Sequence, residues 1–274
     1  MLGSPIAHSR SPQLHLAAYR VLGLTGWTYE RIECTAEQLP PLVRGLGPEW
    51  VGLSVTMPGK FVALSVADSR TRRAEMAGSA NTLVRVDGGW RADNTDVDGV
   101  AGALGSVFRG ERSDGEIDGP AAVLGSGGTA PAAVVALAQL GVPELVIVAR
   151  NPDKARALVE LAERLGVPGR WIRLGSPLPE LAAAVSTLPA QVAGEYAGTV
   201  EQVPVLLDAI YDPWPTPLAR TVSAAGGRVI SGLQMLLHQA YAQVEQFTGL
   251  PAPKAAMAAA LEQAGQDSQA SQDD

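Results

Sequence analysis

The chain has 274 residues, enough for two domains of ordinary size, and 46% of them are hydrophobic against 18% charged. This composition supports a substantial core and excludes a largely disordered chain. The formal net charge of −7 argues against a nucleic-acid or anionic-membrane partner, because such partners attract a basic face. The charge says little about a small anionic substrate, because a local pocket can be basic on an acidic protein; our expectation is a small-molecule substrate and a monomer or homodimer.

The single cysteine, Cys34, cannot form an internal disulfide, and no histidine lies near it in the sequence to activate a thiol. We expect it to be a small buried hydrophobic residue. His8, His15 and His238 lack the spacing of metal ligands, so no metal site is expected. No apolar run reaches the length of a membrane span, and the N-terminus lacks the pattern of a signal peptide. These features predict a cytoplasmic protein.

Residues 1–5, at the start of the first half, have the sequence of a turn, and no strand is predicted there. The polar loop that follows carries Ser9 and Ser11, whose hydroxyls could donate to a carboxylate or cap the turn. Residues 50–55 are expected to form a buried strand. Two further strands, 82–86 and 90–93, flank Asp87-Gly88-Gly89, which is a hairpin signal.

The second half alternates between short apolar runs and segments of helical period, which indicates a parallel sheet with helices on both faces. A helix is expected at 97–108, before a polar linker at 109–120. Strands are expected at 121–124, 145–150, 171–174, 184–186, 205–210 and 228–230. Helices are expected at 129–140, from Asn151 to about residue 165, at 233–248 and at 253–263.

A glycine-rich turn, Gly125-Ser126-Gly127-Gly128-Thr129-Ala130, follows the first of these strands and opens a helix. This context is typical of a dinucleotide site. Gly125 permits the tight turn, Gly127 lets the backbone approach a pyrophosphate, and Ala130 allows close packing of helix and strand. Gly128 and Thr129 lie at the helix N-terminus, which favours phosphate. A glycine-rich turn without a ligand is the alternative.

The residues at the end of the strand expected at 145–150 indicate whether the cofactor is NAD or NADP. NAD sites usually have an acidic residue there for the ribose 2′-hydroxyl, whereas this chain has Ala149-Arg150-Asn151, with Lys154 one turn on. Arg150 and Lys154 could pair with a 2′-phosphate, so we expect NADP(H). The alternative is that both are ordinary solvated charges.

A lysine and an aspartate lie on two loops of the first half, in Ser54-Val55-Thr56-Met57-Pro58-Gly59-Lys60 and Asn94-Thr95-Asp96. Hydride delivery to a ketone creates an alkoxide that needs a proton, and an ammonium beside a carboxylate can supply it. We expect Lys60 to be the charged donor, with Asp96 orienting it and binding a substrate hydroxyl. A surface salt bridge, or no contact between the two, is the alternative.

Six segments form a combined pattern: 3–12 (GSPIAHSRSP), 54–60 (SVTMPGK), 80–83 (ANTL), 93–96 (DNTD), the glycine-rich turn and 232–240 (GLQMLLHQA). In this pattern the chain resembles the shikimate dehydrogenase family over nearly its whole length. The resemblance implies NADPH-dependent reduction of 3-dehydroshikimate to shikimate in aromatic amino acid (chorismate) biosynthesis. A quinate or aminoshikimate dehydrogenase, or a non-catalytic metabolite sensor, would share much of this pattern.

The resemblance also implies roles for single residues. Ser9 and Ser11 would hold the substrate carboxylate, and Lys60 and Asp96 would be the catalytic pair. The other implied substrate and nicotinamide contacts are Thr56, Asn81, Tyr211 and Gln239 for the substrate, and Gly232 and Met235 for the nicotinamide. Ser54 and Ala149 depart from the family pattern, which commonly has Asn at both positions.

These observations together predict an α/β protein of two domains with a cleft between them. Residues 1–97 and 234–263 would form a substrate-binding catalytic domain, and 98–233 a Rossmann-like NADP-binding domain. Residues 264–274 are polar and are expected to be a flexible tail.

Overall fold

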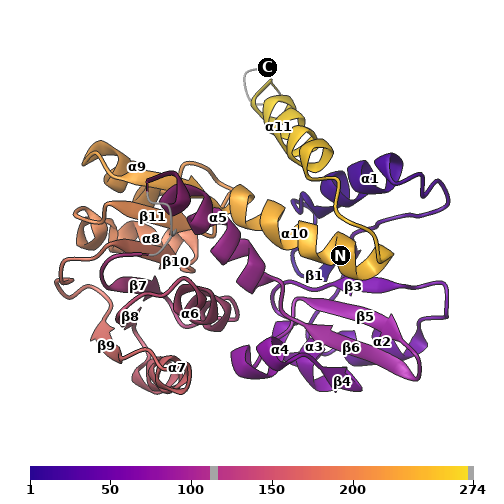
Figure 1. Cartoon of the computed structure of the whole chain (residues 1–274), viewed down its shortest axis with the longest axis horizontal. Coiled ribbons are helices and arrows are strands. Elements are labelled where there is room, and N and C mark those ends of the chain that lie inside the picture. Colours follow the sequence, from indigo (N-terminus) through magenta and orange to yellow (C-terminus); the bar gives the residue numbers. More distant parts are fainter. Residues whose placement is uncertain (112–116, 271–274) are drawn as a thin grey trace. The chain divides into compact units, whose positions relative to one another are not determined.

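A computed structural model describes residues 1–111 and 117–270 of the chain (Figure 1). The chain divides into two compact units. The first comprises Met1–Thr95 and the chain from Leu236 onward, and the second comprises Asp96–Met235. The segment 109–120, predicted to be a linker, does not separate the units but lies within the second one. Residues 112–116 of that segment lie outside the described residues.

The first unit contains a two-stranded parallel sheet and a four-stranded mixed sheet. The strands of the smaller sheet are β1 (Leu2–Gly3) and β2 (Ile32–Glu33), and those of the larger one are β3 (Gly52–Ser54), β4 (Ser69–Arg70), β5 (Thr82–Val86) and β6 (Gly89–Asp93). The order β3-β5-β6-β4 places β5 antiparallel to β3 and β6, which confirms the predicted hairpin. β1 pairs in parallel with β2, and Leu2 also bridges to Val55. The first residues of the chain therefore do contribute a strand, although only a short one.

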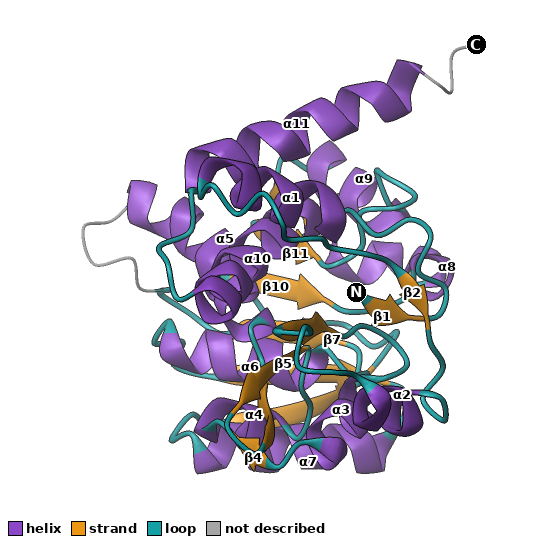
Figure 2. Cartoon of the chain, turned by 90° about the vertical axis from the view of Figure 1, so that its right-hand side faces the viewer, coloured by secondary structure: helices purple, strands orange, loops and turns teal. Residues whose placement is uncertain are grey.

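Helices pack on these strands and on one another. They are α1 (Ser11–Val21), α2 (Leu39–Gly45), α3 (Lys60–Val66), α4 (Arg72–Ala77), α10 (Gly232–Thr248) and α11 (Lys254–Ala270). α11 packs along α1 (Figure 2) and continues past residue 263, where the flexible tail was predicted to begin. Cys34 is buried in the core, as predicted, and burial raises the pKa of its thiol. His15 is likewise packed, stacked on Tyr29 with ring centres 4.1 Å apart.

The second unit is a parallel sheet in the order β12-β11-β10-β7-β8-β9, which confirms the predicted Rossmann-like architecture. Its strands are β7 (Ala121–Leu124), β8 (Leu145–Ala149), β9 (Gly169–Arg173), β10 (Ala183–Ser186), β11 (Val205–Asp208) and β12 (Arg228–Ser231). The helices are α5 (Asp96–Glu111), α6 (Ala130–Gln139), α7 (Pro152–Arg164), α8 (Ala190–Glu195), the 3₁₀ turn η1 (Ala197–Val200) and α9 (Pro217–Ala224).

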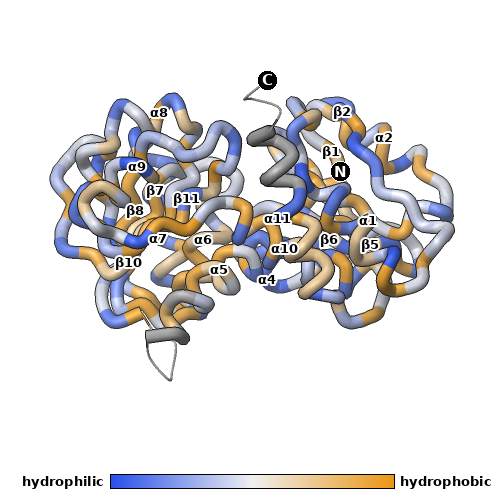
Figure 3. Tube along the Cα trace, turned by 90° about the horizontal axis from the view of Figure 1, so that it is seen from above, coloured by the Kyte–Doolittle hydropathy of each residue, from blue (hydrophilic) through white to orange (hydrophobic). Residues whose placement is uncertain are grey.

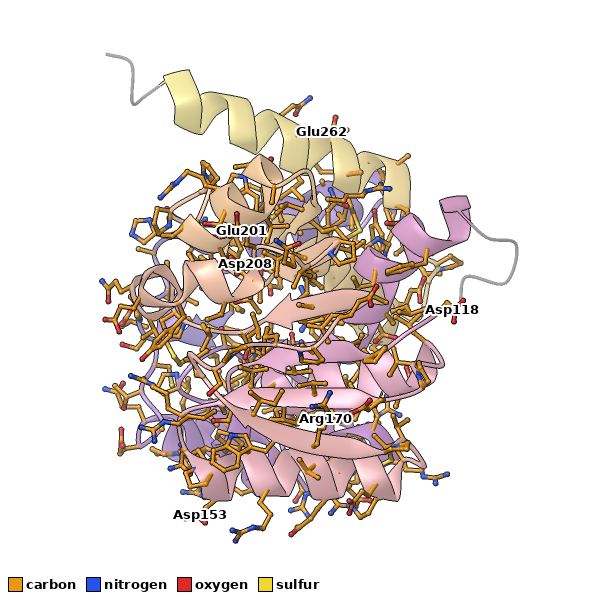
Figure 4. All side chains as sticks on the ribbon, turned by 90° about the vertical axis from the view of Figure 1, so that its left-hand side faces the viewer. Asp118, Asp153, Arg170, Glu201, Asp208 and Glu262 are labelled. Carbon is orange, nitrogen blue, oxygen red and sulfur yellow. The ribbon has the colours of Figure 1, made fainter. Side chains whose placement is uncertain are left out.

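The central strands of this sheet are buried along their whole length, because helices cover both faces. They form the hydrophobic interior of the unit (Figure 3). The strands run parallel, toward the edge where Asp153 lies in the first turn of α7 and away from Asp118, which precedes β7 (Figure 4). The carboxyl ends of the strands therefore share one edge, where ligands of such sheets bind. Within the described residues, no helix combines the length and apolarity needed to cross a membrane.

Asp93 ties the end of β6 to two helices of the first unit. Its carboxylate accepts hydrogen bonds from Thr71 Oγ1 at 2.6 Å, Arg73 Nε at 2.7 Å and Gln246 Nε2 at 2.7 Å. Burial alone would raise the pKa of Asp93, but the hydrogen bonds from Arg73 and Thr71 and the charge of Arg73 outweigh it and lower the pKa to about 2. Asn94-Thr95-Asp96 follows directly, so this cluster anchors the loop with the predicted catalytic aspartate.

We predict that Asp93→Asn lowers the free energy of unfolding by about 2 kcal/mol at pH 7. The folded-state pKa lies below the unfolded value, so the carboxylate stabilises the fold above about pH 4 and loses this effect as the pH falls toward 2. Denaturant unfolding across this range should therefore show the wild-type advantage shrinking with acidity. The control is Asp87→Asn in the exposed hairpin turn. Equal losses in the two variants would contradict the anchoring role.

Candidate active site

Asn81 connects the motif segments of the first unit. Its side-chain Oδ1 accepts a hydrogen bond from the backbone N–H of Thr95 at 2.8 Å, and its Nδ2 donates to Thr95 Oγ1 at 2.9 Å and Gln239 Oε1 at 3.3 Å. Its backbone oxygen accepts from Val55 N at 2.7 Å. Asn81 and Gln239 are both nearly buried, so the structure brings these two predicted substrate residues together in one polar cluster.

The two predicted catalytic residues are each attached to this cluster through the backbone. Lys60 is the first residue of α3, and its carbonyl accepts from the N–H of Ala80 at 2.9 Å, next to Asn81. Asp96 is the first residue of α5 and follows Thr95, which Asn81 holds by two of its side-chain atoms. Asp96 is 5% exposed. Hydrogen bonds to Ala80 and Asn81 therefore hold the backbone at Lys60 and just before Asp96 in place.

The predicted carboxylate-binding loop lies at the start of α1. Ser9 and Ser11 are both buried, and the Oγ atom of Ser11 has no hydrogen-bond partner among the described residues. A buried hydroxyl without a partner is costly, which makes Ser11 a ready donor to a ligand. Arg31 holds this loop, because its Nε and Nη2 both donate to the carbonyl of Ser9, at 2.9 and 2.7 Å. Arg31 lies outside every motif of the sequence, so only the structure shows its part in this loop.

A second chain of hydrogen bonds passes through Ser54, which stands where the family commonly has Asn. The hydroxyl of Tyr29 donates to Ser54 Oγ at 2.5 Å, and Ser54 donates to Gln243 Oε1 at 2.7 Å. Gln243 Nε2 then donates to Thr82 Oγ1 at 2.8 Å. Ser54 is thus engaged inside the protein. Tyr29 and Gln243 were missed by sequence reasoning because neither lies in a motif, although Gln243 lies one turn from Gln239 on α10.

Thr56, the remaining predicted substrate residue of this unit, packs against Gly3. A Cβ atom at position 3 would collide with Thr56 Cγ2 and approach the carbonyl of Met57 to 2.9 Å. Thr56 N also donates to Leu2 O at 2.8 Å. Glycine is therefore required at position 3 for the segment 54–60 to reach β1.

The glycine-rich turn of the second unit fits a dinucleotide. Gly125 has φ +105°, and a Cβ there would lie 2.6 Å from Thr187 Oγ1, so only glycine makes this turn without strain. A Cβ on Gly127 would meet nothing within 4 Å, which leaves room for a phosphate to approach the backbone. Thr129 is the N-cap of α6 and Ala130, fully buried, its first residue, so the N–H groups of the first turn lie at this edge.

The adjacent strand end carries the predicted phosphate-binding charges. β8 ends at Ala149, and Arg150 and Lys154 are both exposed at the start of α7. Asn151 caps this helix by accepting from Lys154 N at 3.0 Å, as predicted. The residues present therefore suit a dinucleotide that carries an additional phosphate on its adenosine ribose.

Tyr211, Gly232 and Met235 lie at the same carboxyl edge, after β11 and β12. Asp208, at the end of β11, is buried; its carboxylate accepts from Thr216 Oγ1 at 2.6 Å and Ile210 N at 3.2 Å, so it holds the loop that carries Tyr211. Burial raises the pKa of Asp208 despite these hydrogen bonds. A side chain at Gly232 would collide with the carbonyl of Ala209, so α10 can begin here only with glycine.

Family models match both ends of the chain. Residues 1–83 match the shikimate dehydrogenase substrate binding domain, and residues 232–262 match the shikimate 5'-dehydrogenase C-terminal domain. The second match includes Gly232, Met235 and Gln239.

Similar proteins match over almost the full length. A shikimate dehydrogenase (NADP(+)) of Methylobacterium radiotolerans is 36% identical over 93% of this chain and 92% of its own. The crystal structure of Mycobacterium tuberculosis shikimate dehydrogenase is 66% identical with a TM-score of 0.86, and the match covers 95% of this chain and 97% of that one. The Thermus thermophilus enzyme, solved in complex with NADP(H) and shikimate, is 30% identical with a TM-score of 0.79, covering 96% and 97%. On this similarity and on the shared motifs, the chain belongs to the shikimate dehydrogenase family.

Proposed function

We propose that this protein catalyses the reversible NADPH-dependent reduction of 3-dehydroshikimate to shikimate. The observation that carries the proposal is the buried polar cluster around Asn81, on which the segments leading to Lys60 and Asp96 meet. A cyclic substrate with several hydroxyls needs such a set of amides and hydroxyls. The names of the relatives support the same assignment.

The substrate would be held by residues of the first unit. The hydroxyls of Ser9 and Ser11 would donate to its carboxylate, as the buried Ser11 hydroxyl without a partner favours. The ring hydroxyls would bond to Thr56, Asn81 and Gln239. Because Asn81 and Gln239 already bond to each other, they present a fixed arrangement of donors and acceptors. Tyr211, on the loop held by Asp208, would lie near the substrate.

NADPH, when bound, would supply the hydride for this reduction. Lys60 would donate a proton to the carbonyl oxygen as negative charge develops there, and Asp96 would orient Lys60 and accept a hydrogen bond from a neighbouring hydroxyl. Gly125, Gly127, Gly128, Thr129 and Ala130 would bind the pyrophosphate, Arg150 and Lys154 the 2′-phosphate, and Gly232 and Met235 would line the nicotinamide.

The direct test follows NADPH absorbance with 3-dehydroshikimate, and compares shikimate, quinate and aminoshikimate in the oxidative direction. We expect shikimate to have the highest kcat/KM. Turnover of quinate or aminoshikimate alone would reassign the substrate, and no turnover of any of them would contradict the proposal.

We predict that Lys60→Ala lowers kcat roughly 100-fold or more and changes KM far less, because the ammonium acts in the transition state. Steady-state kinetics with 3-dehydroshikimate measures both constants. The control is Lys254→Ala, which removes a lysine whose Nζ lies 5.5 Å from the Tyr241 ring centre. A large rise in KM with an unchanged kcat would make Lys60 a binding residue instead.

We predict that the wild-type protein prefers NADPH to NADH and that Arg150→Gln lowers kcat/KM for NADPH roughly 10-fold or more, with little effect on NADH. Arg156→Gln is the matched control, since Arg156 pairs with Asp153 on α7 at 3.5 Å. A wild-type preference for NADH would overturn the cofactor assignment.

A further inference from the structure

The edge strand β9 carries a further cationic residue, Arg173, beside the end of β8, which directly precedes Arg150. In the parallel pairing of β8 with β9, Arg173 lies directly opposite Ala149. Arg173 is exposed, and both strands end here at the carboxyl edge of the sheet. The backbone of the next residue, Leu174, donates to the carbonyl of Ala149 at 3.2 Å, so this register extends past the last strand residue.

Trp171 points toward the same edge. Its backbone pairs with Ile147, two residues before Ala149, but its indole Nε1 donates to the carbonyl of Ala149 at 3.0 Å. The ring therefore lies along the strand in the direction of the carboxyl end. It is 41% exposed, so much of its aromatic surface is open although its only polar group is satisfied.

Trp171 and Arg173 share the face of the sheet that α7 covers. Side chains alternate along a strand, so both lie on the same side as Gly169, which approaches the Ala162 and Val159 side chains of α7. Lys154 is in the first turn of that helix. Arg170 points to the opposite face and forms an ion pair with Glu144, away from this edge. The acidic residue of the first turn, Asp153, is engaged by Arg156.

We propose that Arg173 and Trp171 complete the adenosine 2′-phosphate subsite. Arg173 supplies a second guanidinium to the phosphate, opposite Arg150, and Trp171 supplies a flat surface for the adenine. The inference rests on the proposed use of NADP(H). It explains how the chain can bind the phosphate with an apolar Ala149 at the strand end, because the neighbouring strand provides the missing contacts.

Isothermal titration with adenosine 2′,5′-bisphosphate and with AMP tests the inference without substrate or turnover. Arg173→Gln should weaken binding of the bisphosphate roughly 10-fold and leave AMP nearly unchanged. Arg173→Lys should recover only part of the loss, because an ammonium lacks the planar fork. The control Arg170→Gln should bind both nucleotides as the wild type does. Equal bisphosphate affinity in Arg173→Gln and wild type would overturn the role of Arg173.

Tryptophan fluorescence tests the second residue. The bisphosphate should quench the emission of the wild type and of Trp27→Phe, and the quenching should be largely lost in Trp171→Phe, which retains an aromatic ring. Undiminished quenching in Trp171→Phe would overturn the adenine contact. If the wild type bound the bisphosphate no more tightly than AMP, the proposed use of NADP(H) would be wrong. If the wild type preferred the bisphosphate and Arg173→Gln did so equally, only the role of Arg173 would be wrong.

Discussion

The hydrogen bonds of Asn81 are the constraint on which the first unit depends. The backbone carbonyl of Asn81 bonds to Val55 in the segment 54–60. Its side-chain amide bonds to Thr95 in the segment 93–96 and to Gln239 in α10. These segments are distant in the sequence, and each carries a residue of the proposed active site. Burial makes the arrangement specific, because a change that leaves one of these buried groups without a hydrogen-bond partner lowers stability by the full desolvation free energy of that group.

Further polar contacts hold this arrangement in place from outside. Asp93 fixes the end of β6 to α4 and α10, Arg31 fixes the loop of Ser9, and the hydroxyl of Ser54 joins Tyr29 to Gln243. In the second unit, Asp208 plays a comparable part for the loop that carries Tyr211. Residues that never contact the substrate would thus determine where the contacting residues lie, which is how a preorganised site reduces the cost of binding.

The second unit was largely predictable from the sequence, because continuous apolar runs such as 121–124 and 145–149 are buried on both faces and alternate with helical segments. The first unit was less so. The strands β1, β2 and β4 have two residues each, too few to show a period of two, and depend on pairing with distant partners. Helix α11 extends to Ala270 through a polar sequence that composition alone indicated as a tail.

The site residues divide in the same way. Motifs point to Asn81, Lys60 and the glycine-rich turn as candidates. The hydrogen bonds of Arg31 and Tyr29, and the strand pairing of Trp171 and Arg173, follow no local pattern and are seen only in the structure. The sequence alone shows that Ser54 and Ala149 differ from the family pattern. Only the structure shows the hydrogen bonds of Ser54 to Tyr29 and Gln243 and the pairing of Ala149 with Arg173.

A crystal structure of the protein with shikimate and NADP⁺ bound together would test the proposed active site most directly. We expect the substrate carboxylate within hydrogen-bond distance of the Ser9 and Ser11 hydroxyls, with Lys60 Nζ and the Asp96 carboxylate both beside the hydroxyl that is oxidised. A substrate bound elsewhere, or a lysine and an aspartate too far apart to share that hydroxyl, would contradict it.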